Sequence, residues 1–116
     1  MPRVLVLDDD GDTLVFLGKL LSMIPVDAVP AACCAVARDA ARTMGPFDIV
    51  IADSLLPDGD GVELALELKR DYGCATVIMS GFDPPDDGAP KGIDLWIVKP
   101  VRLPELREAI RSLAKS

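Results

Sequence analysis

The sequence predicts an α/β fold in which one doubly wound parallel sheet carries helices on both faces. Short apolar runs rich in β-branched residues alternate with segments of helical periodicity along the chain, and no linker or repeat interrupts them. A length of 116 residues is enough for one buried core and too short for two. We therefore expect residues 1–116 to form a single domain.

The first strand and helix are expected at residues 3–7 and 12–24. The strand is an apolar run that ends in acidic residues, and Pro25 closes the helix. Apolar residues recur every three or four positions in the helix: Leu14, Leu17, Leu20, Leu21 and Ile24. A weaker strand is expected at 26–32, where Pro30 indicates the edge of the sheet because proline cannot donate to a neighbouring strand.

The remaining elements follow in the same alternation. A helix of small residues at 35–44 ends before Gly45-Pro46, and residues 48–52 are the clearest central strand, followed by Asp53. The next expected elements are a helix at 61–72, strands at 75–79 and 93–98, and a final amphipathic helix at 103–113. Residues 82–92 break the pattern: their three prolines and two glycines argue against a helix longer than one turn.

Composition excludes several functional classes. The net charge of −7 argues against a nucleic-acid surface. No apolar run is long enough to span a membrane, and the N-terminus lacks a signal peptide, so we expect a cytoplasmic protein without a membrane partner. The absence of histidine excludes His-based zinc sites, Ser-His-Asp triads and phosphohistidine carriers, and the three cysteines are expected to be free and mostly buried.

Chemically active side chains stand where four of the predicted strands end: Asp8 and Asp9, Asp53, Ser80 and Lys99. Ligands bind outside the carboxyl ends of the strands in a doubly wound sheet, so these groups should share one crevice. Three carboxylates there need a cation, and an all-oxygen site suits Mg²⁺, with Mn²⁺ able to substitute. Together with Lys99 and Ser80 they are the parts that phosphoryl transfer requires, and Asp53 is the candidate nucleophile.

Four motifs occur in an order that resembles response-regulator receiver domains: Leu7-Asp8-Asp9-Asp10, Asp53-Ser54-Leu55-Leu56-Pro57-Asp58-Gly59-Asp60-Gly61, Met79-Ser80-Gly81 and Lys99-Pro100. The resemblance covers nearly the whole chain. It implies a flavodoxin-like receiver fold with strand order 2-1-3-4-5, and the proline-rich segment implies a shortened or missing fourth helix.

The resemblance also implies a role for each site residue. Asp8, Asp9, Asp53 and the backbone carbonyl of Leu55 would bind the metal, and Asp53 would be phosphorylated. Ser80 would close on the phosphoryl group, Lys99 would pair with it, and Trp96 would be the switch aromatic. The Lys99–Pro100 bond, with Pro100, would be cis, an isomer that X–Pro bonds tolerate.

The resulting hypothesis is a two-component phosphorelay receiver. It would accept a phosphoryl group from a histidine kinase or histidine phosphotransfer protein and then switch its binding to a downstream protein target. It would catalyse its own phosphorylation and dephosphorylation without turning over an external substrate.

Three alternatives compete with this hypothesis. One is a degenerate receiver that binds partners without phosphorylation. A haloacid-dehalogenase-like phosphatase would need a further acid after Lys99, and only Glu105 and Glu108 follow. A calcium loop at Asp58 fails because its first ligand position holds Leu56.

Overall fold

A five-stranded parallel sheet forms the centre of the computed structural model, which describes residues 1–114. The strands are β1 (Arg3–Leu7), β2 (Asp27–Ala31), β3 (Ile49–Asp53), β6 (Ala75–Ser80) and β7 (Leu95–Val98). Their order in the sheet is β2-β1-β3-β6-β7, and every neighbouring pair is parallel. The predicted strand order 2-1-3-4-5 is therefore confirmed, with the proline-containing β2 at an edge.

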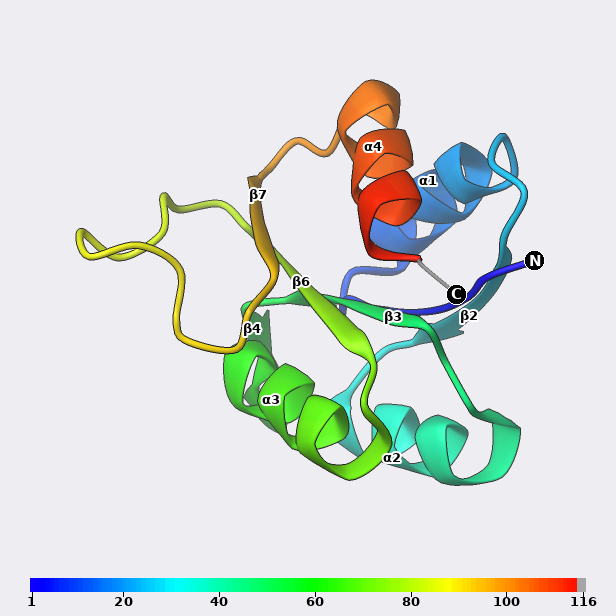
Figure 1. Ribbon diagram of the computed structural model, residues 1–116, viewed down its shortest axis with the longest axis horizontal. Coiled ribbons are helices and arrows are strands. Elements are labelled where there is room, and N and C mark those ends of the chain that lie inside the picture. Colours follow the sequence, from blue (N-terminus) through cyan, green and yellow to red (C-terminus); the bar gives the residue numbers. More distant parts are fainter. Residues whose placement is uncertain (115–116) are drawn as a thin grey trace.

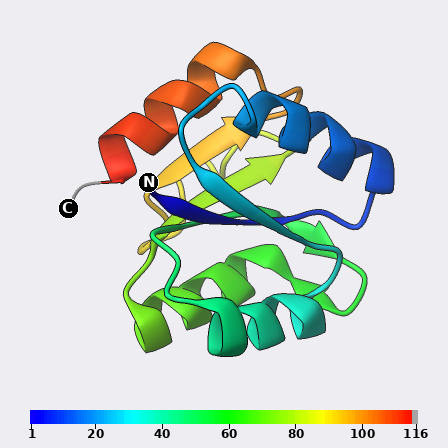
Figure 2. The same cartoon turned by 90° about the vertical axis from the view of Figure 1, so that its right-hand side faces the viewer.

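Two pairs of helices cover the two faces of the sheet (Figures 1 and 2). The first face carries α1 (Gly11–Leu21) and α4 (Leu103–Leu113), and the second carries α2 (Cys34–Met44) and α3 (Gly61–Tyr72). Because side chains alternate along a strand, a strand buried on both faces must be apolar throughout. In β1, Val4 packs toward the first face and Leu5 toward the second, which explains the continuous apolar runs.

Two elements differ from the prediction by more than one residue at one end. Helix α1 ends at Leu21, three residues early, because the hydroxyl of Ser22 donates to the carbonyl of Lys19 at 2.6 Å and the chain turns there. Ile24 is still buried in that turn. Strand β7 begins at Leu95 because the N–H and carboxylate of Asp94 bind Thr76 across the loop.

A short antiparallel hairpin, not predicted from the sequence, lies between β3 and α3. It pairs β4 (Leu55–Leu56) with β5 (Gly59–Asp60), and Asp60 then caps α3 by accepting a hydrogen bond from the N–H of Val62 at 2.8 Å. Two residues per strand is near the lower limit for a strand, and such pairing leaves no periodic signal in a sequence.

No helix forms between β6 and β7, a segment that lies wholly within the described residues. It is instead a loop that projects from the body of the molecule, drawn in yellow in Figure 1. The prediction of four helices, with the fourth receiver helix shortened or missing, is thereby confirmed. All three cysteines are free, and two of them, Cys34 and Cys74, are buried. Across residues 1–114, no helix combines the length and apolar character needed to span a bilayer.

Candidate functional site

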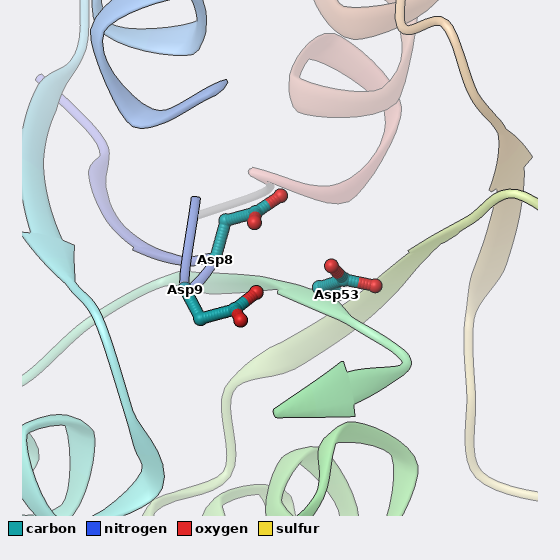
Figure 3. Close-up of side chains that lie close together, drawn as sticks. All are labelled: Asp8, Asp9 and Asp53. Carbon is teal, nitrogen blue, oxygen red and sulfur yellow. The ribbon is translucent and has the colours of Figure 1, made fainter. Parts of the chain in front are cut away.

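Three acidic side chains meet at the carboxyl end of the sheet. Asp8 and Asp9 follow β1, and Asp53 is the last residue of its neighbour β3. One carboxylate oxygen from each lies within 4.8 Å of the other two, and Figure 3 shows the three side chains close together. Asp8 is buried, at 1% exposure, whereas Asp9 is exposed. The predicted convergence of these acids is present in the structure.

Lys99 joins the acids from the end of β7. Its Nζ donates to Oδ2 of Asp8 at 2.9 Å and to Oδ2 of Asp53 at 3.1 Å. Burial alone would lower the pKa of Lys99, but the hydrogen bonds to Asp8 and Asp53 outweigh it and raise the pKa above its ordinary value. The lysine is therefore a fixed positive charge between two carboxylates. Its peptide bond to Pro100 is cis, the isomer that the resemblance implied.

The donor set formed by these side chains fits a hard divalent cation. Three carboxylates facing one ammonium leave two negative charges unbalanced, and all the available ligand atoms are oxygens. Asp9, the most exposed of the three acids, can exchange solvent for a metal at little cost. The backbone carbonyl of Leu55 belongs to the hairpin that directly follows Asp53, and the N–H of the same residue donates to Asp53 Oδ1 at 3.3 Å.

Ser80, at the end of β6, is connected to Trp96 by hydrogen bonds. Its Oγ is 3.1 Å from Oγ of Ser54 and accepts the backbone N–H of Phe82 at 3.1 Å. The carbonyl of Phe82 in turn accepts the indole N–H of Trp96 at 3.0 Å. The Ser80 hydroxyl is buried, at 1% exposure, so these contacts are its main partners in this state. A movement of the Ser80 hydroxyl would therefore break its contacts with Ser54 and Phe82.

The chain turns back sharply after Asp53. The N–H of Gly61 donates to the carbonyl of Ser54 at 2.9 Å, and a Cβ at position 61 would lie 1.7 Å from the carbonyl oxygen of Asp53. Only glycine fits this approach, which explains the Asp-Gly pair at the start of α3. The side chain of Leu55 is 67% exposed, so its position depends on the backbone around it.

An apolar recess of about 370 Å³ opens beside Lys99, between the start of α1 and the segment before α4. Phe16, on its rim, is 47% exposed. The recess is lined by Thr13, Phe16, Leu17, Lys99, Pro100 and Val101.

The phosphatase alternative finds no support in this arrangement. Glu105 and Glu108 are exposed on α4, and neither belongs to the acidic group that the described residues form. Sequence reasoning missed the contacts of Ser54 and Phe82 with Ser80. The Ser54 contact depends on how β3 and β6 lie side by side, which leaves no local pattern in the sequence. The Phe82 contact is a local turn, in which the Ser80 hydroxyl accepts the N–H two residues further on.

Comparison with known proteins gives one consistent result. The family model described as "Response regulator receiver domain" matches residues 4–111. The two-component response regulator ORR26 of Oryza sativa subsp. japonica is 34% identical over 110 residues, which cover 90% of this chain and 19% of that protein. The transcriptional regulatory protein PrrA of Mycobacterium tuberculosis is 32% identical over 118 residues, covering 98% of this chain and 50% of that protein. The chain thus spans half or less of the length of these relatives.

Solved structures show the same fold. The signal receiver domain of an HD domain-containing protein from Pseudomonas fluorescens Pf-5 superposes with a TM-score of 0.88 at 25% identity, covering 97% of this chain and 93% of that one. The response regulator protein TrrA from Thermotoga maritima, solved in complex with Mg²⁺–BeF, gives a TM-score of 0.86 at 24% identity. It covers 97% of this chain and 99% of that chain.

Proposed function

The chain belongs to the response regulator receiver domains of two-component signalling, and we propose that it accepts a phosphoryl group on Asp53 with the help of Mg²⁺. The observation that carries the proposal is the position of Lys99, whose ammonium bridges Asp8 and Asp53 beside the third acid, Asp9. The proposal is also supported by the relative from Thermotoga maritima, which was solved with Mg²⁺–BeF.

The residues of the site have separate tasks. Asp8, Asp9, Asp53 and the carbonyl of Leu55 would hold Mg²⁺, which when bound neutralises charge on phosphoryl oxygens. Lys99 already contacts Asp53 and binds a second phosphoryl oxygen as the group arrives. One carboxylate oxygen of Asp53 attacks phosphorus, the new O–P bond forms, and the bond from phosphorus to the donor's imidazole nitrogen breaks. The imidazole keeps the electron pair of that bond.

These 116 residues contain no histidine, so a phosphohistidine that donates the group would lie outside them. Receiver domains interact with histidine kinases or phosphotransfer proteins, and we infer a donor of this kind acting in the cytoplasm. The apolar recess beside Lys99 supports a donor that docks across α1 and brings its phosphohistidine to Asp53. A downstream protein target would then read the phosphorylated state.

The change of state would begin at Ser80. Its hydroxyl would leave Ser54 and the N–H of Phe82 to bind a phosphoryl oxygen on Asp53. Phe82 would lose one of its two anchors, and the indole of Trp96, held by the carbonyl of Phe82, would follow. This is how phosphorylation would reach the loop between β6 and β7.

Phosphorylation by a small donor tests the proposal. We expect the protein to gain one phosphoryl group from acetyl phosphate in Mg²⁺ or Mn²⁺ and none in EDTA, measured by intact mass spectrometry. Asp53→Asn should stay unmodified. The matched control Asp71→Asn, an exposed acid on α3, should be labelled like the wild type. Equal labelling of Asp53→Asn would place the acceptor elsewhere. A wild-type protein that no donor labels would instead favour a phosphorylation-independent binding module.

A further inference from the structure

Helix α2 lacks a cap of its own. Its N-cap residue, Cys33, makes no side-chain hydrogen bond to the helix, and the first turn contains no acidic residue. The first N–H groups of a helix have no partner within the helix, and a cap normally supplies one. The start of α2 therefore needs an acceptor from another part of the chain.

Asp58 supplies that acceptor from the turn of the β4–β5 hairpin. Its Oδ1 accepts the N–H of Cys34 at 2.7 Å, and its Oδ2 accepts the N–H of Ala35 at 3.0 Å. Both oxygens are thus used on the first turn of α2, where the helix dipole favours a negative charge. The two bonds connect segments that are 23 and 24 residues apart in the sequence.

The same contact fixes the free end of the hairpin. At its base, the hairpin is closed by the bond between Gly61 N–H and the carbonyl of Ser54. At its turn, Gly59 lies against α2, where a Cβ would come within 3.0 Å of Cys34 Sγ. A pair of two-residue strands is not stable alone, and only Leu56 packs against the core from it. The position of the hairpin therefore depends on its two ends.

Leu55 lies between these two anchors. Its side chain is mostly exposed, so side-chain packing does little to fix its position. Its N–H donates to Asp53, and its carbonyl is the proposed metal ligand. We propose that Asp58 is a positioning residue for the phosphoacceptor site, holding the Leu55 backbone at the acids by tying the hairpin to α2. The inference rests on the metal site of the proposed function and adds to it a residue that touches neither metal nor phosphoryl group.

The direct test is the Asp58→Ala variant, studied first without any phosphoryl donor. We expect its Mg²⁺ affinity, measured by isothermal titration calorimetry, to fall by about 10-fold, the usual size of such an indirect effect on a metal site. In the metal-free protein, backbone amides of residues 54–60 should exchange with deuterium faster than in the wild type. Phosphorylation by acetyl phosphate should need correspondingly more Mg²⁺.

A second substitution separates positioning from simple stability of α2. Cys33→Ser gives α2 an N-cap side chain able to accept the N–H of Ala35, so Asp58→Ala combined with Cys33→Ser should regain the thermal midpoint of unfolding. The hairpin stays untied in this double variant, so its Mg²⁺ affinity should remain low. Recovery of the affinity together with the midpoint would mean that Asp58 only stabilises the helix, and the inference would be wrong.

Arg38→Ala serves as the matched control. It removes a bidentate ion pair between α2 and Glu67 of α3, at 2.8 and 3.1 Å, and leaves both Asp58 hydrogen bonds to α2 in place. Mg²⁺ affinity should be unchanged in it, and a loss equal to that of Asp58→Ala would overturn the inference. If the wild type binds Mg²⁺ but is never phosphorylated, the proposed function fails, while the affinities and exchange rates still decide the role of Asp58. If the wild type is phosphorylated and Asp58→Ala behaves identically, the inference alone fails.

Discussion

Replacing Lys99 by methionine removes the one positive charge among three carboxylates. Lys99→Met keeps the length and apolar stem of the side chain but leaves Asp8 without its partner at 2.9 Å and Asp53 without its partner at 3.1 Å. The side chain of Asp8 is 1% exposed, so water cannot fully replace the ammonium. We expect the metal-free variant to be less stable than the wild type.

The size of the loss follows from the surroundings of Asp8. A fully buried charge that loses its partner costs about 3–5 kcal/mol. Asp8 keeps one hydrogen bond, from the N–H of Asp10 at 3.0 Å, and the side chain of Lys99 is 29% exposed. Both facts reduce the loss, so we expect about 2–3 kcal/mol in the free energy of unfolding. Because the pKa of Lys99 is raised, its contribution is fully present below its unfolded pKa, and it is lost only as pH rises through the folded pKa.

Urea unfolding in EDTA measures this loss of stability, and urea unfolding in Mg²⁺ measures how much the metal stabilises each protein. Mg²⁺ stabilises whichever state binds it, and it should stabilise Lys99→Met more than the wild type because no ammonium competes for Asp8 and Asp53. Lys19→Met, on the exposed face of α1, makes the same side-chain exchange and should change neither quantity. The reasoning fails if Lys99→Met is as stable as the wild type in EDTA, or if both gain equally from Mg²⁺.

Two further predictions concern the loop between β6 and β7 and the ion pair of Lys69 with Asp94 at its end. Residues 82–92 should exchange their amide hydrogens rapidly in the unmodified protein and more slowly with beryllofluoride bound; strong protection in the unmodified protein would contradict this. Burial alone would raise the pKa of Asp94, but the hydrogen bonds from Lys69 and Thr76 outweigh burial and lower the pKa below its ordinary value. The stability that Asp94 contributes is therefore present above its unfolded pKa and is lost as pH falls through its folded pKa. Lys69→Met should therefore be less stable than the wild type at pH 7. Urea unfolding should show this difference in stability narrowing below about pH 4. A difference that stays constant with pH would contradict a stabilising Lys69–Asp94 ion pair.

The sequence predicted the strands and helices well because their signals are local and repeated. Strand β3 is apolar on both faces, and α4 carries an amphipathic stripe, so each was found within a residue of its true bounds. The β4–β5 hairpin and the early end of α1 were missed because each depends on a few specific hydrogen bonds. The bond of Ser22 to Lys19 is an example of a contact with no periodic signal.

The candidate site was predictable for a related reason. Parallel strands end at the same edge of a sheet, so the strand-end positions of Asp8, Asp53 and Lys99 were enough to predict that they lie together. What could not be predicted is which hydrogen bonds the other residues around the site make. The contact of Ser80 with Ser54, and the cap that Asp58 places on α2, join side chains to distant backbone or to neighbouring strands. Such contacts follow from the three-dimensional packing.

The loop that replaces the fourth receiver helix is held differently at its two ends, and this limits where it can move. At its far end, the carbonyl of Gly92 accepts both Thr76 Oγ1 at 2.8 Å and Lys69 Nζ at 3.0 Å. Thr76 is fully buried in β6, so this end of the loop is tied to the sheet. At its near end, Phe82 is held only by Ser80 and Trp96, the residues expected to move. Phosphorylation should therefore move the loop from Phe82 onward and leave Gly92 in place. A partner that recognises the phosphorylated state would then contact a segment that is mobile at one end and fixed at the other.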